Sequence, residues 1–163
     1  MDEVGETAAA GEAAAVDAAD GGAGEEDRPT IAGHPLVRLL RRTAEREVWV
    51  AADASGAGVE LHRSVPGEEA LLAREVEALL LADHPHLLPI LDVATDAGVV
   101  VVRPLLPHDL ADWLRDRGSP DPGEAVTALA PIAAALGALH AVGATAGAVS
   151  AHHVRLDADG APL

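Results

Sequence analysis

The feature that most constrains this 163-residue chain is a set of missing residue types: it has no Cys, Lys, Asn, Gln, Phe or Tyr. Without Cys, the chain cannot form disulfides, thiolate metal sites or a cysteine nucleophile. Without Lys, Asn or Gln, every mechanism that needs a side-chain ammonium or carboxamide is excluded. The 11 basic residues are therefore all Arg. These absences limit the chemistry of the chain more than any single motif does.

The charge of the chain is strongly negative and unevenly distributed. The formal net charge is -16, so nucleic acid is not expected as a partner, because phosphate contacts need a basic face. Residues 1–29 are almost entirely Ala, Gly, Asp and Glu, and they hold half of this net charge. Such a segment has too little apolar surface to offset its chain entropy. We predict a disordered acidic tail here, with a dedicated interaction arm as the other interpretation.

The sequence gives no sign of export or membrane insertion. No apolar run approaches the roughly 20 residues needed to cross a bilayer. The N-terminus is acidic, whereas a secretory signal begins with positive charge. We therefore expect a cytoplasmic protein with no membrane segment in this chain.

Residues 31–105 show the periodicities of an α+β fold. Apolar–polar alternation over 36–42 and 47–51 predicts a hairpin, and 59–63 predicts a third strand. A helix is predicted over 66–82, because Pro66 suits a first helical turn and one face is continuously apolar. That face consists of Leu72, Val76, Leu79 and Leu80.

The remaining elements are two strands, two helices and a C-terminal turn. Residues 87–93 and 99–102 predict an antiparallel strand pair. Residues 109–117 predict a short helix and about 122–142 a long one, before a short extended pair around the turn at 157–160. One stripe of the long helix needs a partner surface. It consists of Val126, Leu129, Ile132, Leu136 and Leu139.

Several segments resemble the bacterial, actinobacterial-type, eukaryotic-like serine/threonine protein kinases. RLLRR at 38–42 and EVWVA at 47–51 look like the first two strands of that family. REVEAL at 74–79, followed by HPHLLPILDV at 84–93, is similar to its helix C and fourth strand. Further matches resemble the hinge and the family's helices D and E. These are PLLP at 104–107, LADWL at 110–114 and LGALHAVG at 136–143.

The resemblance implies a protein-kinase-like fold that is truncated at Leu163, before the family's Asp-Phe-Gly metal motif. It implies a five-stranded antiparallel N-lobe sheet with helix C, followed by the first helices of the C-lobe. The implied domains are the tail at 1–29, a kinase-like N-lobe at 30–105 and the start of a C-lobe at 106–163. By the same resemblance, the chain could be the cytosolic part of a membrane-associated protein.

The kinase positions that hold ATP are degenerate in this chain. Thr43 to Arg46, where the family has its phosphate-binding loop, contains no glycine. His62 stands where the family has its strand-three Lys, and a neutral imidazole replaces an ammonium poorly. Glu75 matches the helix-C Glu, which pairs with that Lys in the family. We expect Glu75 either to be solvated or to pair with an Arg or with His62.

The catalytic loop and the adenine pocket depart from the family in the same way. Ala148 stands at the position of the catalytic Asp, and His153 at that of the metal-binding Asn. Arg103 occupies the gatekeeper position beside the adenine pocket. We therefore predict no catalytic residue, no confident cofactor-binding residue and no metal ligand, with ATP binding lost or weak.

The sequence favours a non-catalytic pseudokinase domain or fragment that acts as a regulatory or protein-interaction module. Its partner would be another protein or a neighbouring domain, and no cofactor is expected. The alternative is a diverged serine/threonine protein kinase that uses ATP and Mg, with the rest of its C-lobe outside this chain. A third hypothesis is a decayed reading frame without a selected function.

Other catalytic signals in the sequence are weaker. His84 with His86, and His152 with His153, supply only two ligands each for a metal site. Ser150 lacks the glycine-flanked turn that surrounds the nucleophile of a hydrolase. We interpret these residues as parts of turns and of the degenerate loop.

Overall fold

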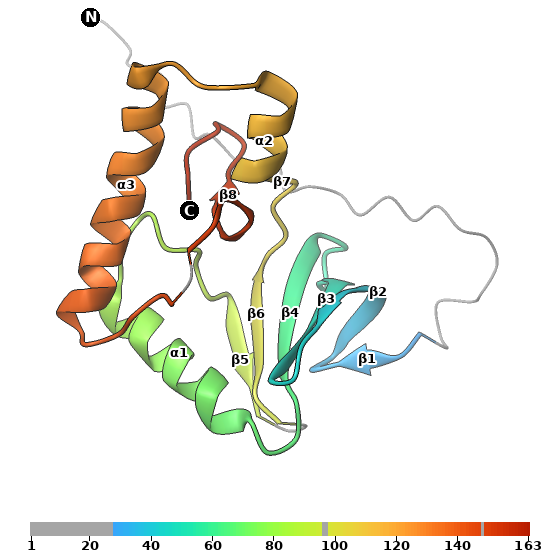
Figure 1. Cartoon of the computed structure of the whole chain (residues 1–163). Coiled ribbons are helices and arrows are strands. Elements are labelled where there is room, and N and C mark those ends of the chain that lie inside the picture. The colour runs from blue at the N-terminus through green and yellow to red at the C-terminus, as the bar shows by residue number, and fades with distance from the viewer. Residues whose placement is uncertain (1–27, 96–97, 148) are drawn as a thin grey trace, which may run out of the picture.

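The computed structural model describes residues 28–95, 98–147 and 149–163, and it is an α+β structure. Six antiparallel strands form one curled sheet in the order β1-β2-β3-β4-β6-β5, and β7 with β8 forms a second, two-stranded sheet. Figure 1 shows α1 and α3 together beside the sheet, with α2 near β7 and β8. The first sheet contains Thr30–Ile31 (β1), His34–Arg42 (β2), Arg46–Ala52 (β3), Gly58–Ser64 (β4), Asp92–Ala94 (β5) and Val100–Pro104 (β6). The other elements are Glu69–Ala82 (α1), His108–Asp109 (β7), Leu110–Arg117 (α2), Pro122–Ala141 (α3), a 3-10 turn at Ala151–His153 (η2) and Arg155–Leu156 (β8).

The predicted hairpin at 36–51 is present as β2 and β3, and the third strand as β4. A tight turn joins β3 to β4, in which the Asp53 carboxylate accepts bonds from the N–H groups of Ser55 and Ala57. Gly56 has a φ of 85° in this turn, a conformation that costs glycine little. The central strands β3 and β6 are rich in Val, which suits a buried pleated surface.

Both faces of β6 are buried, because successive strand residues point to opposite faces of a sheet. Val100 and Val102 belong to a core cluster with Leu61 of β4. Val101 packs on the other face against Leu72 and Val76 of α1. The core of the molecule therefore lies in the sheet and under α1, and this packing fixes α1 across one face of the sheet.

Three sequence predictions need correction. The helix predicted from Pro66 begins at Glu69, because Gly67 has a φ of 94° and Glu68 is still outside the helix. The strand predicted over 87–93 is formed only at Asp92–Ala94, after a segment interrupted by Pro85 and Pro89. The sheet has six strands and not five, because Thr30 and Ile31, which precede the predicted hairpin, form the short strand β1.

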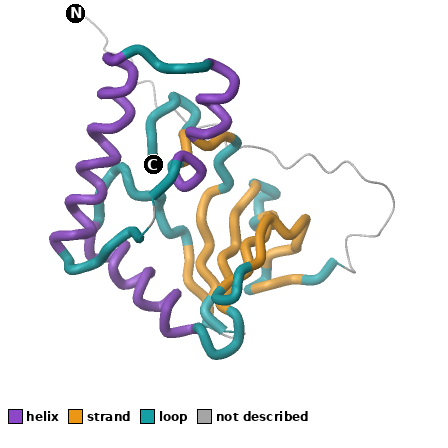
Figure 2. Tube along the Cα trace, in the orientation of Figure 1, coloured by secondary structure: helices purple, strands orange, loops and turns teal. Residues whose placement is uncertain are grey.

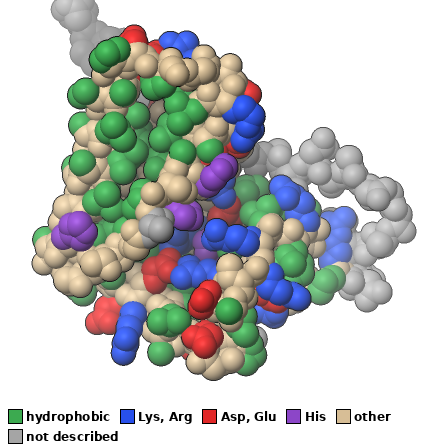
Figure 3. Space-filling view, in the orientation of Figure 1, with side chains coloured by type: hydrophobic (Ala, Val, Ile, Leu, Met, Phe, Trp, Pro, Cys, Tyr) green, Lys and Arg blue, Asp and Glu red, His purple; other side chains and the backbone are tan. Residues whose placement is uncertain are grey.

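After β7 the chain is largely helical (Figure 2), and few residues of α2 and α3 are buried. The Asp109 carboxylate caps α2 by accepting a bond from Asp112 N–H. Asp121 and Glu124 cap α3 reciprocally, as a capping box. Only Ala135 and Leu139 of α3 are buried. The expected apolar stripe is exposed at Val126 and Leu129 and half-buried at Ile132 and Leu136. Figure 3 shows hydrophobic side chains gathered over α3, with charged side chains concentrated over the sheet.

Among the described residues, α3 alone is long and apolar enough to cross a membrane by length and composition. A single helix of this kind is weak evidence, and the structure therefore shows no clear membrane span. At 20 residues, α3 is longer than any continuous apolar run in the sequence. Its Ala, Gly and Pro residues extend the helix between the larger apolar side chains without adding charge.

Candidate functional site

Six charged or ionisable side chains meet on the sheet face that α1 covers. We call them the charged cluster. They are Arg46 of β3, Glu60 and His62 of β4, Glu75 of α1, Arg103 of β6 and Arg155 of β8. Strand register brings several of them together, because residues directly opposite in an antiparallel pair share a face. Glu60 lies opposite Arg103, and His62 lies opposite Val101, which packs against α1.

Glu75 binds an arginine with each of its two oxygens. Arg46 Nη2 donates to Oε2 at 2.5 Å, and Arg103 Nη2 donates to Oε1 at 2.9 Å. The two arginines come from β3 and β6, which are not neighbouring strands. The Arg103 side chain is only 12% exposed, so its charge depends on this carboxylate for compensation. Glu75 thus links α1 to two strands of the sheet.

A local turn at the start of β3 positions Arg46. The Thr43 hydroxyl accepts bonds from the N–H groups of Glu45 and Arg46, and Thr43 N–H donates to the Arg46 carbonyl. This short turn begins β3 at Arg46, which pairs in register with Ser64 of β4. This glycine-free turn therefore positions the Arg46 guanidinium beside Glu75.

The second half of the cluster centres on Glu60, which is 3% exposed. One of its oxygens lies 3.3 Å from His62 Nε2, and Arg155 donates to the other. His62 is also buried, and its Nδ1 has no hydrogen-bond partner within the described part of the chain. Arg155 comes from β8 near the C-terminal end, so Glu60 ties that segment to the large sheet.

The pKa values of the cluster follow from these contacts. Burial alone would raise the pKa of Glu75, but the bond from Arg46 and the charges of Arg46 and Arg103 outweigh it, so the pKa is lowered. The pKa of Glu60 is lowered likewise, with burial opposed by His62 and Arg155. Burial lowers the pKa of His62, although Glu60 acts against this. At neutral pH the two carboxylates are ionised and the imidazole is neutral.

The three arginines exceed the two carboxylates by one charge when His62 is neutral. Each oxygen of Glu75 and Glu60 lies beside a basic side chain of the protein, so both carboxylates are already compensated without a metal ion. In residues 28–95, 98–147 and 149–163, no group of three or more His, Asp or Glu side chains could hold a metal ion. The cluster is therefore arranged to hold elements together by paired charges.

The structure brings three of the five predicted family positions into this cluster. Glu75 pairs with two arginines, one of the two outcomes expected for it, and Arg103 is one of its partners. His62 lies in the cluster but pairs with Glu60 instead of Glu75. His153 lies apart in η2, where its Nδ1 is 3.3 Å from the Ser150 hydroxyl on the surface. Ala148 lies outside the described residues.

Sequence reasoning missed Arg46, Glu60 and Arg155. Arg46 had a local signal, since it begins the strand that follows Thr43. Glu60 also had one: an acid at a strand position buried on one face needs a cation. Arg155 had no such signal, because it lies 95 residues from Glu60 in sequence.

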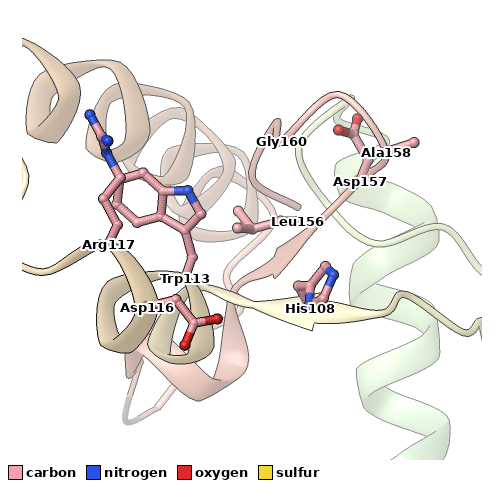
Figure 4. Close-up of a pocket in the computed structure, with 8 residues that line it drawn as sticks. All are labelled: His108, Trp113, Asp116, Arg117, Leu156, Asp157, Ala158 and Gly160. Carbon is pink, nitrogen blue, oxygen red and sulfur yellow. The ribbon is translucent and has the colours of Figure 1, made fainter.

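A pocket also lies between α2 and the C-terminal turn. Its lining includes His108, Trp113, Arg117 and Asp157. The Arg117 guanidinium lies 5.7 Å from the centre of the Trp113 ring, a cation–π contact. In Figure 4 the labelled polar side chains do not converge on one point. The pocket offers no paired acid and base, so the charged cluster remains the better candidate site.

The chain matches no protein-family model and no curated protein, so a functional assignment has to rest on the geometry of the charged cluster.

Proposed function

We propose that this chain is a non-catalytic domain of the protein-kinase-like fold that acts as a regulatory or protein-interaction module. The order of elements supports this: antiparallel strands, a helix between the third and fourth strands of the predicted lobe, then a helical section. The contact of α1 with the sheet through Glu75 also supports it, since the family's helix C presents a Glu at this place.

One observation carries the non-catalytic part of the proposal. Both oxygens of Glu75 are engaged by Arg46 and Arg103, and His62 at the Lys position is buried against Glu60. A kinase uses a Lys on the equivalent strand, paired to the helix-C Glu, to hold the phosphates of ATP. Here that arrangement is replaced by internal ion pairs. The chain would have to break them before it could bind a triphosphate.

The test measures nucleotide binding by thermal unfolding of the full chain, with and without Mg-ATP at millimolar concentration. A ligand at 100 times its Kd adds about 2.7 kcal/mol, which moves the midpoint of a domain this size by several degrees. We expect no shift. An upward shift of several degrees on a cooperative transition would contradict the proposal.

The alternative, a diverged serine/threonine kinase, is favoured by the one excess positive charge of the cluster. It predicts phosphate transfer from ATP to a generic protein substrate with Mg²⁺ or Mn²⁺. It also predicts that Glu75→Ala abolishes this transfer, whereas Glu77→Ala, at an exposed position on the same helix, does not. We expect no transfer from any of the three proteins.

A further inference from the structure

One edge of the large sheet is open over most of its length. β2 has nine residues and pairs with β3 along one side. Along its other side, β1 pairs only with His34 and Pro35, and the Pro29 carbonyl accepts one more bond from Leu36 N–H at 2.9 Å. Over 37–42 this side has no strand partner among the described residues. An unpaired strand of this length can accept another extended segment.

Pro29 explains why β1 begins only at Thr30. The next step of the β1–β2 ladder would require an N–H at Pro29 to return a bond to Leu36, and proline has none. The hydrogen-bond ladder between β1 and β2 therefore stops at Pro29. The edge at 37–42 is thus better suited to a segment from another protein than to a continuation of β1.

The open edge is basic in an acidic protein. Residues 37–42 contain Arg38, Arg41 and Arg42 and no acid. Arg42 already pairs with Glu47 at 2.6 Å, whereas Arg38 and Arg41 are exposed and have no ion-pair partner within the described residues. Screening limits the reach of charge to about 8 Å at physiological salt, so these local charges matter more than the net charge of -16.

Two register irregularities in β2 decide which of its side chains lie on each face of the sheet. The register with β3 shifts between Leu36 and Arg38, and again between Leu39 and Arg41. As a result Arg38 lies opposite Val50 and Arg41 opposite Val48, two β3 residues that share a face. Leu39, which is 38% exposed, lies opposite Trp49 on the other face. The edge therefore offers two cations on one face and an apolar side chain on the other.

We propose that the edge of β2 at residues 37–42 binds an extended acidic segment of a partner protein, which adds a strand to the sheet. This inference rests on the proposed function, in which the chain acts through a partner. Main-chain hydrogen bonds to β2 hold the segment. Its alternating carboxylates meet Arg38 and Arg41 on one face, and its intervening apolar side chains contact Leu39 on the other.

The test titrates the full chain with a blocked seven-residue peptide that alternates Val and Glu. We expect saturable binding, with amide protection and NMR shifts confined to β2 around 37–42. Arg41→Glu weakens the binding about fivefold or more, because it replaces an attraction by a repulsion. Arg74→Glu, an equal charge change at an exposed position on α1, leaves the affinity unchanged. Raising the salt from about 0.05 M to about 0.5 M weakens the wild-type binding.

Several results would overturn the inference. One is equal binding of a peptide with Lys at every Glu position, and another is undiminished binding of an acidic peptide that is N-methylated along its pairing edge. A third is binding that emerges only when Glu25, Glu26 and Asp27 are replaced by Gln, Gln and Asn, because the chain's own tail would then occupy the edge. A fourth is an edge that pairs only with a second copy of the chain, detected as dimerisation in sedimentation.

The absence of any peptide binding would also overturn the inference, with Arg38 and Arg41 then serving only to prevent unwanted edge pairing. That result is independent of the Mg-ATP test. If no peptide binds to β2 and Mg-ATP does not shift the unfolding midpoint, the proposed non-catalytic function still holds. A nucleotide shift removes that function whether or not the peptide binds.

Discussion

The sheet with α1 and the helical section that follows it achieve their stability differently. In the sheet, Leu61 and Val101 are fully buried, and charges that leave water are paired. In the helical section, α2 has no buried residue, and Val126 and Leu129 of α3 are 66% and 58% exposed. The sheet is organised around a core, whereas the helices depend mainly on caps and on contacts with α1 and η2. A stable part and a weakly anchored part thus coexist in one chain.

The largest expected effect breaks the core of the sheet. Leu61→Ala removes a side chain that is 0% exposed, so it should lower the free energy of unfolding by about 2–5 kcal/mol. Leu129→Ala on α3 makes the same chemical change at an exposed position and should cost less than about 0.5 kcal/mol. Denaturant unfolding of both variants measures the contrast. Similar losses in the two would show that α3 has a covered face.

The charged cluster should give the next largest effect. Glu75→Ala leaves Arg46 and Arg103 without their shared carboxylate, so we expect a loss of about 1–3 kcal/mol in unfolding free energy. Glu77→Ala, exposed on α1, is the matched control and should be nearly neutral. Chemical denaturation at neutral pH compares the two. If both variants unfold at the wild-type midpoint, Glu75 does not tie α1 to the sheet.

A smaller effect should appear with pH. The pKa of His62 is lowered in the folded protein by burial, with Arg103 and Arg46 adding to this and Glu60 opposing it. Below about pH 6.5, His62 therefore becomes protonated in the unfolded chain but stays neutral in the folded chain. Stability should fall as pH decreases through this window, by up to about 1.4 kcal/mol per pH unit, until the lower folded pKa is reached.

The pH effect can be assigned with two variants. His62→Leu should flatten the stability profile between pH 6.5 and the onset of carboxylate protonation, because it removes the titrating group. His140→Leu, at an exposed position on α3, should retain the wild-type slope. Below about pH 4.5 stability should fall in every variant, since the lowered pKa values of Glu60 and Glu75 stabilise only the ionised, folded state. An unchanged slope in His62→Leu would assign the effect to another group.

Most secondary structure could be predicted from the sequence because it is set locally. The apolar–polar alternation of β3 and β4, the capped start of α3 and the helix after Asp109 all carry short-range signals. The strand predicted over 87–93 was wrong because a longer-range effect decided where β5 begins. Residues 87–91 are apolar enough for a strand, yet β5 starts only at Asp92, where β6 provides a partner.

The candidate site was predictable only in part, for a related reason. The resemblance to the kinase family marked Glu75, and its expected partners were narrowed to an Arg or His62. The choice of Arg46 and Arg103 depends on which strands lie beside α1. The choice of Arg155 as the partner of Glu60 depends on a contact between segments 95 residues apart, which no local pattern encodes.

The two ion pairs that Glu75 makes with arginines on nonadjacent strands have a consequence for the freedom of α1. These ion pairs hold α1 against β3 and β6, so the position of the helix is set by residues of the chain itself and does not require a bound ligand. Both arginines are paired in the arrangement that the structure shows, so a ligand can move α1 only if it binds another arrangement more tightly. If the chain acts as the proposed interaction module, a rotation of α1 would first have to break these two ion pairs. On that proposal, α1 presents the same surface with and without a bound partner.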